Sequence, residues 1–153
     1  MAWGFPVPTL DAELRARALR LLARREHSRA ELRRKLAPHA GEDFDLDPLL
    51  DDFTKRGWLS EERFVEQTVR VKARKYGPLK IAHHLREKGI DAQGVEKGLA
   101  QAKAEEGEAL ASAWRARFGR APRDEVERAK QVRFLQQRGF SLGPIMAFLK
   151  SLP

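Results

Sequence analysis

The feature that most constrains this chain is a dense series of helix start and stop signals. Apolar residues recur at spacings of three and four along most of the sequence, with helix-forming residues between them, and this periodicity is typical of helices that pack through one face. The start signals are Ser28 with Glu31, Asp47 as the cap before Pro48, Ser60, Gly77 before Pro78, Asp91 and Ser141. The stop signals are Gly57, Gly89 and Gly139. The sequence therefore predicts an all-α protein.

Nine helices follow from these signals. We expect them at residues 11–25, 29–37, 48–56, 61–75, 78–88, 92–103, 106–117, 122–138 and 142–150. Helices this short are marginal alone in water, so each must be stabilised by packing on its neighbours. The proline-containing start, residues 1–9, is expected to be an extended segment.

The sequence also repeats itself. Shifts of 49 and then 64 residues align equivalent positions in three copies: Leu22, Val71 and Leu135; Arg25, Arg74 and Arg138; His27, Tyr76 and Phe140; Leu32, Ile81 and Ile145; and Leu36, Leu85 and Leu149. Each copy has an aliphatic residue, then a ring, then a helix cap, then two apolar positions four residues apart. This order describes one helix-turn-helix corner that is repeated three times. The alternative is chance coincidence among common helix residues. We predict three tandem three-helix repeats, at residues 10–59, 60–104 and 105–153, in an elongated and curved array.

Catalytic and metal-binding motifs are missing from the sequence. The chain has no cysteine, which excludes disulfides, thiolate metal sites and cysteine nucleophiles and fits a reducing compartment. The acidic stretch 42–47 alternates carboxylates like a calcium loop, but Pro48 and Thr54 stand where that loop requires Gly and Glu. His83 and His84 are neighbours, and neighbours on a helix point about 100° apart, so they cannot chelate one metal ion together. We therefore expect no enzymatic activity, no cofactor and no metal site.

The first eight residues resemble neither a signal peptide nor a membrane span. They carry no basic residue, and Pro6 and Pro8 interrupt them. We expect a cytoplasmic protein.

Basic residues are the informative feature for function. The formal net charge is +8 and the pI about 10.2, so the chain should attract polyanions such as nucleic acid or a nucleoprotein. On the helix that begins at Glu61, the side chains of Arg63, Arg70 and Arg74 fall within about 40° of one another. Phe64, Thr68 and Val71 are expected on the opposite, packed side. The predicted contact residues are Arg17, Arg20, Arg24, Arg63, Arg70, Arg74, Lys75 and Lys80. The alternative is a solvated helix face, although the acidic residues are concentrated elsewhere, within residues 42–52.

The aromatic residues give a different indication. Trp58, Phe64, Trp114 and Phe118 occur at helical spacing with aliphatic residues, which predicts core positions and not platforms for stacked bases.

Three stretches together resemble the RecX family: residues 18–36; Arg63-Phe64 followed by residues 76–90; and residues 133–141, which end in Arg138-Gly139-Phe140-Ser141. Each motif alone is ordinary helix punctuation, whereas their order and spacing taken together are specific. The similarity covers about residues 10–151. The chain departs from the family pattern in its proline-rich start before Thr9 and in the acidic connection at residues 42–47.

The resemblance implies a monomeric regulator, mainly an inhibitor, of the RecA recombinase. Such a protein binds in the groove of the RecA–DNA filament and suppresses strand exchange, ATP hydrolysis and co-protease activity in DNA repair and the SOS response. The implied partners are RecA and its nucleoprotein filament, with direct binding to single- or double-stranded DNA as a further option and no association with membranes. The rival interpretations are a sequence-independent DNA-binding helical-repeat protein and a protein adaptor whose charge serves solubility.

Overall fold

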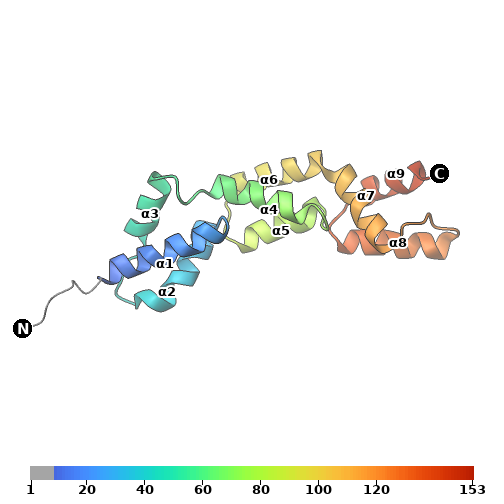
Figure 1. Ribbon diagram of the computed structural model, residues 1–153. Helices are drawn as coiled ribbons and strands as arrows, with labels where there is room; N and C mark the ends of the chain where they lie inside the picture. The colour runs from blue at the N-terminus through green and yellow to red at the C-terminus, as the bar shows by residue number, and fades with distance from the viewer. Residues whose placement is uncertain (1–8) are drawn as a thin grey trace, which may run out of the picture. The chain divides into compact units, whose positions relative to one another are not determined.

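A computed structural model describes residues 9–153 of the chain, and this part contains nine α-helices and no strands (Figure 1). The helices are α1 (Leu10–Arg24), α2 (Arg29–Ala40), α3 (Asp47–Lys55), α4 (Glu61–Lys72), α5 (Pro78–Glu87), α6 (Ala92–Ala104), α7 (Glu106–Arg117), α8 (Glu125–Gln137) and α9 (Leu142–Ser151). The prediction of an all-α fold is confirmed, and every predicted helix is present with ends within three residues of those expected. The prediction of an extended start falls on residues 1–8, which lie outside the described residues, and on Thr9, whose backbone is extended.

Side-chain caps explain where several helices begin. Ser28 Oγ accepts a hydrogen bond from the Glu31 backbone N–H at 3.1 Å, and Asp91 caps α6 through the Gly94 N–H at 2.8 Å. Each such bond satisfies a backbone donor that has no partner within the helix. The prediction that Asp47 caps α3 is wrong. Asp47 is the first residue of that helix, and its carboxylate pairs with Arg29 and Arg33 instead.

The helices form two compact units, residues 1–64 and residues 65–153. In the first unit, α1, α2 and α3 bury one apolar cluster: Leu14, Ala18, Leu32, Leu36, Ala40, Leu46, Leu49, Leu50, Phe53 and Leu59. A buried polar group lies beside this cluster, where Arg25 donates two hydrogen bonds, at 2.9 and 2.7 Å, to the buried carboxylate of Glu31. Burying a carboxylate is unfavourable unless it is paired and hydrogen-bonded, so Arg25 has a structural role here.

The second unit is built around the turn between α4 and α5 and the turn between α8 and α9. The Gly77 N–H donates to the Arg138 carbonyl at 2.7 Å, and the Leu79 N–H donates to the Gly139 carbonyl at 3.1 Å. A Cβ atom at position 77 would lie 2.5 Å from the Gly139 backbone, and Gly139 has a φ of +96°. The two corners therefore pack backbone against backbone, which only glycine permits at these positions.

The repeat alignment is confirmed at the core positions that follow each corner. Leu32, Ile81 and Ile145 are 0, 1 and 0% exposed. The row formed by Leu22, Val71 and Leu135 is wrong: Val71 is 62% exposed, and only Leu135 is fully buried. Val71 lies within α4, but the buried face of this helix is formed by Phe64, Val65, Thr68 and Val69. At about 100° per residue, Val71 points about 90° away from the centre of that face. Val69 and Ala73, on either side of Val71 in the sequence, are buried. The predicted bounds of the three repeats, 10–59, 60–104 and 105–153, stay a prediction.

The aromatic predictions are confirmed in part. Phe64 and Trp114 are buried, and Phe118 is half-buried. Trp58 is 42% exposed, so its predicted core position is wrong. Its ring meets the buried Phe53 edge-on at 5.3 Å between centroids, and Arg56 lies over it.

We predict that Leu32→Ala, Ile81→Ala and Ile145→Ala will each lower the free energy of unfolding of their own unit by about 2–5 kcal/mol, because each change leaves a cavity in a closed core. Urea denaturation followed by circular dichroism measures the loss. Val71→Ala is the matched control, and it should cost less than about 0.5 kcal/mol at its exposed site. Losses below about 1 kcal/mol at all three core positions would contradict the alignment of the corners.

We also predict that Gly139→Ala will destabilise residues 65–153 by about 2 kcal/mol or more, because an alanine there is strained at positive φ and collides with Lys80. Gly143→Ala is the control: a Cβ at position 143 meets no atom within 4 Å, so this change in α9 should be neutral or stabilising. Thermal unfolding of the two variants checks the difference, and equal melting temperatures would contradict the tight joint.

Candidate polyanion-binding surface

The net charge of the chain belongs entirely to the second unit. Residues 1–64 contain 12 basic and 12 acidic side chains, whereas residues 65–153 contain 18 basic and 10 acidic ones. The excess of +8 therefore lies in residues 65–153. A surface that attracts polyanions is expected in this unit.

In the first unit, acidic residues of α3 are paired with arginines. Asp52 accepts hydrogen bonds from Arg15 at 2.6 Å and from Arg56 at 3.0 Å, and Asp51 pairs with Arg29 at 2.7 Å. These pairs connect α3 to α1 and α2. Concentrating acids within residues 42–52 therefore neutralises basic residues of the same unit.

The predicted contact residues have different surroundings. Arg20, Arg24, Arg63, Arg70, Arg74, Lys75 and Lys80 are exposed, and Arg17 is half-buried. Arg63 donates hydrogen bonds to Glu26 at 2.9 Å and to the Gly57 carbonyl at 2.6 Å. Its guanidinium is therefore partly neutralised within the first unit. The predicted helical stripe of Arg63, Arg70 and Arg74 is wrong as geometry, because α4 ends at Lys72 and Arg74 lies in the following turn. Arg70 and Arg74 nevertheless line one hollow, together with Glu105, Glu108 and Ser112.

Arg138 is the centre of a cluster of cations and rings in the second unit. Its guanidinium carbon lies 5.5 Å from the Tyr76 ring centroid and 5.0 Å from that of Phe134. Lys72 and Lys80 lie over Tyr76 at 5.6 and 5.0 Å. Contacts of this kind attract a cation to the ring face at distances up to about 6 Å. The two lysines and Arg138 are thus held around one tyrosine.

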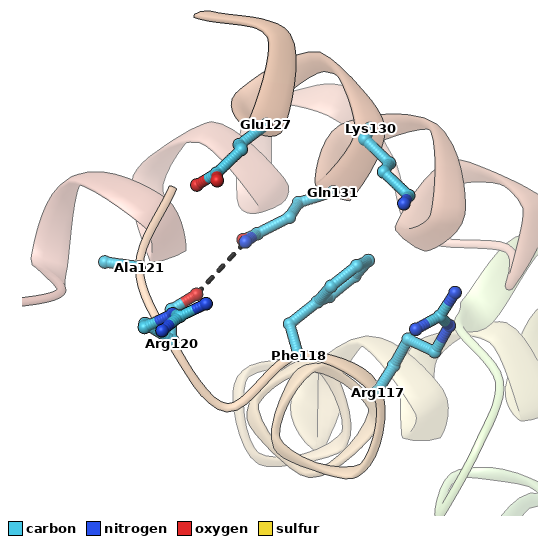
Figure 2. Close-up of a pocket in the computed structure, with 7 residues that line it drawn as sticks. All are labelled: Arg117, Phe118, Arg120, Ala121, Glu127, Lys130 and Gln131. Atoms are coloured by element: carbon cyan, nitrogen blue, oxygen red, sulfur yellow. Dashed lines mark hydrogen bonds between the residues drawn. The ribbon is translucent and has the colours of Figure 1, made fainter. Parts of the chain in front are cut away.

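Two hollows share Arg117, and the first of them adjoins this cluster through Phe134 and Arg138. The first is lined by Arg74, Lys75, Ala113, Ala116, Arg117, Phe134 and Arg138. The second is lined by Arg117, Phe118, Arg120, Ala121, Glu127, Lys130 and Gln131 (Figure 2). Arg117 also lies over both Phe118 and Phe134, at 5.2 and 5.7 Å. Basic residues therefore outnumber acidic ones in both hollows.

The second hollow is held in shape by a buried amide. Gln131 accepts a hydrogen bond from the Trp114 indole N–H at 2.8 Å and donates one to the Arg120 carbonyl at 3.0 Å. This second bond fixes the chain that follows α7, as Figure 2 shows, with Arg117 and Lys130 on one side of Phe118 and Arg120 on the other. The cations thus surround a hollow with a defined wall.

Sequence reasoning missed Arg138, Arg117, Tyr76 and Phe134 as parts of a site. One signal was present: Arg25, Arg74 and Arg138 align in the three copies. The three arginines differ in surroundings, because Arg25 pairs with buried Glu31, Arg74 is exposed and Arg138 lies against two rings. The repeat alignment alone could not separate these roles.

The arrangement is suited to binding anions. Arginine presents planar donors that match carboxylate and phosphate oxygens. Within residues 9–153, no three His, Asp or Glu side chains are grouped so that they could hold a metal ion. In the same residues, no helix is long and apolar enough to cross a membrane.

Fold and surface together define a class: a helical-repeat protein with a basic surface on its second unit. The family models specify the class further. The RecX first three-helix domain matches residues 15–39, the second matches residues 60–102 and the third matches residues 104–149. The chain belongs to the RecX family, which confirms the resemblance found in its sequence.

Curated relatives agree with this assignment. The regulatory protein RecX of Leptothrix cholodnii is 44% identical over 137 residues, which cover 90% of this chain and 87% of the relative. The regulatory protein RecX of Ralstonia nicotianae is 49% identical over 137 residues, covering 88% and 85%. The crystal structure of RecX from Lactobacillus salivarius has the same fold, with a TM-score of 0.73, 23% identity, and coverage of 94% of this chain and 96% of that one.

The ion pairs of the first unit predict acid sensitivity. Hydrogen bonds from Arg33 and Arg15 lower the pKa values of Asp47 and Asp52, respectively, below the ordinary carboxyl range. A carboxyl group whose pKa is lowered by folding stabilises the folded state above its unfolded pKa, and this stabilisation is lost as the pH falls through the folded value. We expect the melting temperature of the first unit to fall as the pH is lowered from neutral to below about 4.

Thermal unfolding by circular dichroism, recorded across this range, measures the effect. Asp52→Asn should reduce both the stability at neutral pH and its dependence on pH. Asp43→Asn, at an exposed position in the preceding connection, is the control and should leave the dependence unchanged. An identical pH profile for Asp52→Asn and the unmodified protein would contradict the role of these pairs.

Proposed function

We propose that this chain binds the RecA–DNA filament and restrains RecA, mainly by inhibiting strand exchange, ATP hydrolysis and co-protease activity in DNA repair and the SOS response. Membership of the RecX family supports the proposal, because its relatives carry the name regulatory protein RecX. In this proposal the chain acts in the cytoplasm as a monomer, by binding and without catalysis.

One observation carries the proposal: the entire excess of positive charge lies in the second unit, where Arg138 of one corner and Lys72 and Lys80 of the other gather around the Tyr76 ring. A nucleoprotein filament presents phosphates and acidic side chains along a continuous groove. Contacts between such groups and arginine attract the partners over long range and weaken as salt increases. Binding to the filament should therefore depend on ionic strength.

The second candidate is sequence-independent binding to naked DNA, which the same charge favours. The two candidates differ in their response to salt. A DNA-binding protein loses affinity steeply with salt on both naked and RecA-coated DNA. A filament regulator should retain much tighter binding to the coated form at physiological salt.

The experiment that tests the proposed function is RecA-catalysed ATP hydrolysis on single-stranded DNA, measured with substoichiometric amounts of this chain. We expect strong suppression by the unmodified protein. Replacing both Arg70 and Arg74 with Glu should raise the concentration needed for inhibition by about tenfold or more, because attraction becomes repulsion at two adjacent points. Both side chains are exposed, so the stability of the fold should change little.

Lys55→Glu is the control, since Lys55 is exposed on α3 in the first unit and its replacement also makes the net charge more negative. It should matter much less than the double change. If the Arg70 and Arg74 variant inhibits as well as the unmodified protein, the contact surface lies elsewhere. If the unmodified protein fails to suppress ATP hydrolysis, the proposed function is wrong.

A further inference from the structure

We propose that the joint between the α4–α5 corner and the α8–α9 corner is a composite site for the phosphodiester backbone of a nucleic-acid strand, centred on Arg138. The site is formed by residues of two three-helix domains. The inference deepens the proposed function, on which it rests in part, by naming the group that the second unit binds.

The first step is the orientation of Arg138. Its guanidinium lies over Tyr76 at 5.5 Å and over Phe134 at 5.0 Å. A guanidinium held against two rings loses little further conformational freedom when it binds a ligand, because its plane is already set. Its N–H groups that do not face the rings remain available to phosphate oxygens. Arg138 is thus an oriented donor.

The second step is that this orientation requires both corners. Tyr76 and Lys80 come from the α4–α5 corner, and Arg138 comes from the α8–α9 corner. The backbone bonds from Gly77 to Arg138 and from Leu79 to Gly139 hold the corners together at 2.7 and 3.1 Å. The cations of the two domains are therefore fixed relative to one another before any ligand binds.

The third step is the course of the cations. The hollow beside Arg138 contains Arg74, Lys75 and Arg117. Arg117 is also part of the next hollow, which contains Arg120 and Lys130 (Figure 2). Because the two hollows share Arg117, their basic residues form a continuous row. This row has more cations than are needed to bind a single phosphate group. A row of this kind fits a ligand with charges repeated along a strand.

The composition of the row favours nucleic acid over a protein partner. Large hydrophobic side chains that are exposed in residues 9–153 are Leu10, Leu19, Trp58, Val71, Leu79, Val126 and Leu142. Leu79 lies at the joint, and the two hollows contain none of these side chains. The core of a protein–protein interface is depleted in charge and anchored by apolar side chains, whereas protein–DNA interfaces are much more positively charged.

The rings themselves indicate contact with the backbone and not with the bases. Stacking of bases requires an accessible aromatic face. Tyr76 is occupied by Lys72, Lys80 and Arg138, and Phe134 by Arg117 and Arg138. The rings therefore orient cations, and contacts from these cations to phosphates carry no sequence information.

Direct binding of the full chain, without RecA, tests the proposal. Fluorescence anisotropy should be recorded with a labelled abasic strand and an oligothymidine, each of about 12 nucleotides, a length within the range that single-stranded sites cover. Polyglutamate of the same number of charges serves as a competitor. We expect the two strands to bind with affinities that agree within about threefold, and polyglutamate to compete at least about tenfold more weakly than unlabelled abasic strand.

Substitutions at the joint distinguish oriented donors from general charge. Arg138→Lys keeps the charge but loses the planar group, and it should weaken binding of the abasic strand by roughly tenfold. Arg138→Ala should also reduce the slope of log affinity against log salt by about 0.7, the value for one lost phosphate contact with a single strand. Phe134→Leu removes no charge and should weaken binding because Arg138 and Arg117 lose a supporting ring.

Lys97→Ala is the matched control, because Lys97 is exposed in the same unit and lines neither hollow. It should change affinity by less than about threefold. Thermal unfolding of every variant shows whether the fold is retained. If a variant at Phe134 unfolds, Arg138→Lys still decides the question, since it leaves both rings in place.

Four results would overturn the proposal: no binding of the abasic strand by the unmodified chain, equally strong competition by polyglutamate, a tenfold preference for the strand with bases, or unchanged affinity of Arg138→Lys. None of these results affects the suppression of RecA ATP hydrolysis, which is measured separately. A chain that inhibits RecA but fails the strand-binding test would bind the filament through its protein.

Discussion

The close approach of two glycine corners is the constraint on which the second unit depends. Gly77 and Gly139 meet backbone to backbone, and the hydrogen bond from the Gly77 N–H to the Arg138 carbonyl is only 2.7 Å long. Because a side chain at either position would collide with the opposing corner, the approach fixes how the second and third three-helix domains meet. The position of Tyr76 beside Arg138 follows directly from this contact. The candidate polyanion-binding surface therefore depends on backbone packing.

Equivalent positions in the repeats have acquired different physical roles. Arg25 neutralises the buried carboxylate of Glu31 in the first unit, whereas Arg138 lies against two rings in the second. Acidic residues of α3 complete this division, since they pair with arginines of α1 and α2. Ion pairs in the first unit thus connect its helices. The net positive charge of the chain lies in the second unit. One corner geometry can support both uses because its core positions stay buried.

The fold could be predicted from the sequence because its signals are local. Helix caps such as Ser28 and the buried row of Leu32, Ile81 and Ile145 depend on residues a few positions apart, and the helix periodicity reports them. The errors arose where tertiary contacts decide. Asp47 forms ion pairs with α2 and does not cap α3. Val71 is exposed because the face of α4 that packs is the one formed by Phe64, Val65 and Val69.

The candidate site could be predicted only in part, for the same reason. The net charge and the run of basic residues from Arg70 to Lys80 indicated a polyanion-binding region. Neither feature indicated that Arg138 lies beside this region. That connection arises where two distant turns meet, and no spacing within either turn encodes it. Phe64 and Trp114 were correctly predicted as core residues, whereas the contacts of Tyr76 and Phe134 with cations require the folded corner.

An arginine held against aromatic rings is better suited to binding phosphates than a lysine on a flexible surface. A lysine ammonium is a strongly hydrated point charge on a mobile stem, so binding must immobilise it. Arginines held by rings lose less entropy and keep a fixed pattern of donors. Since phosphates are identical along a strand, such a pattern gives affinity without preference for sequence. The function proposed for this chain requires contact with a filament assembled on any DNA sequence, and the site proposed at Arg138 would meet this requirement.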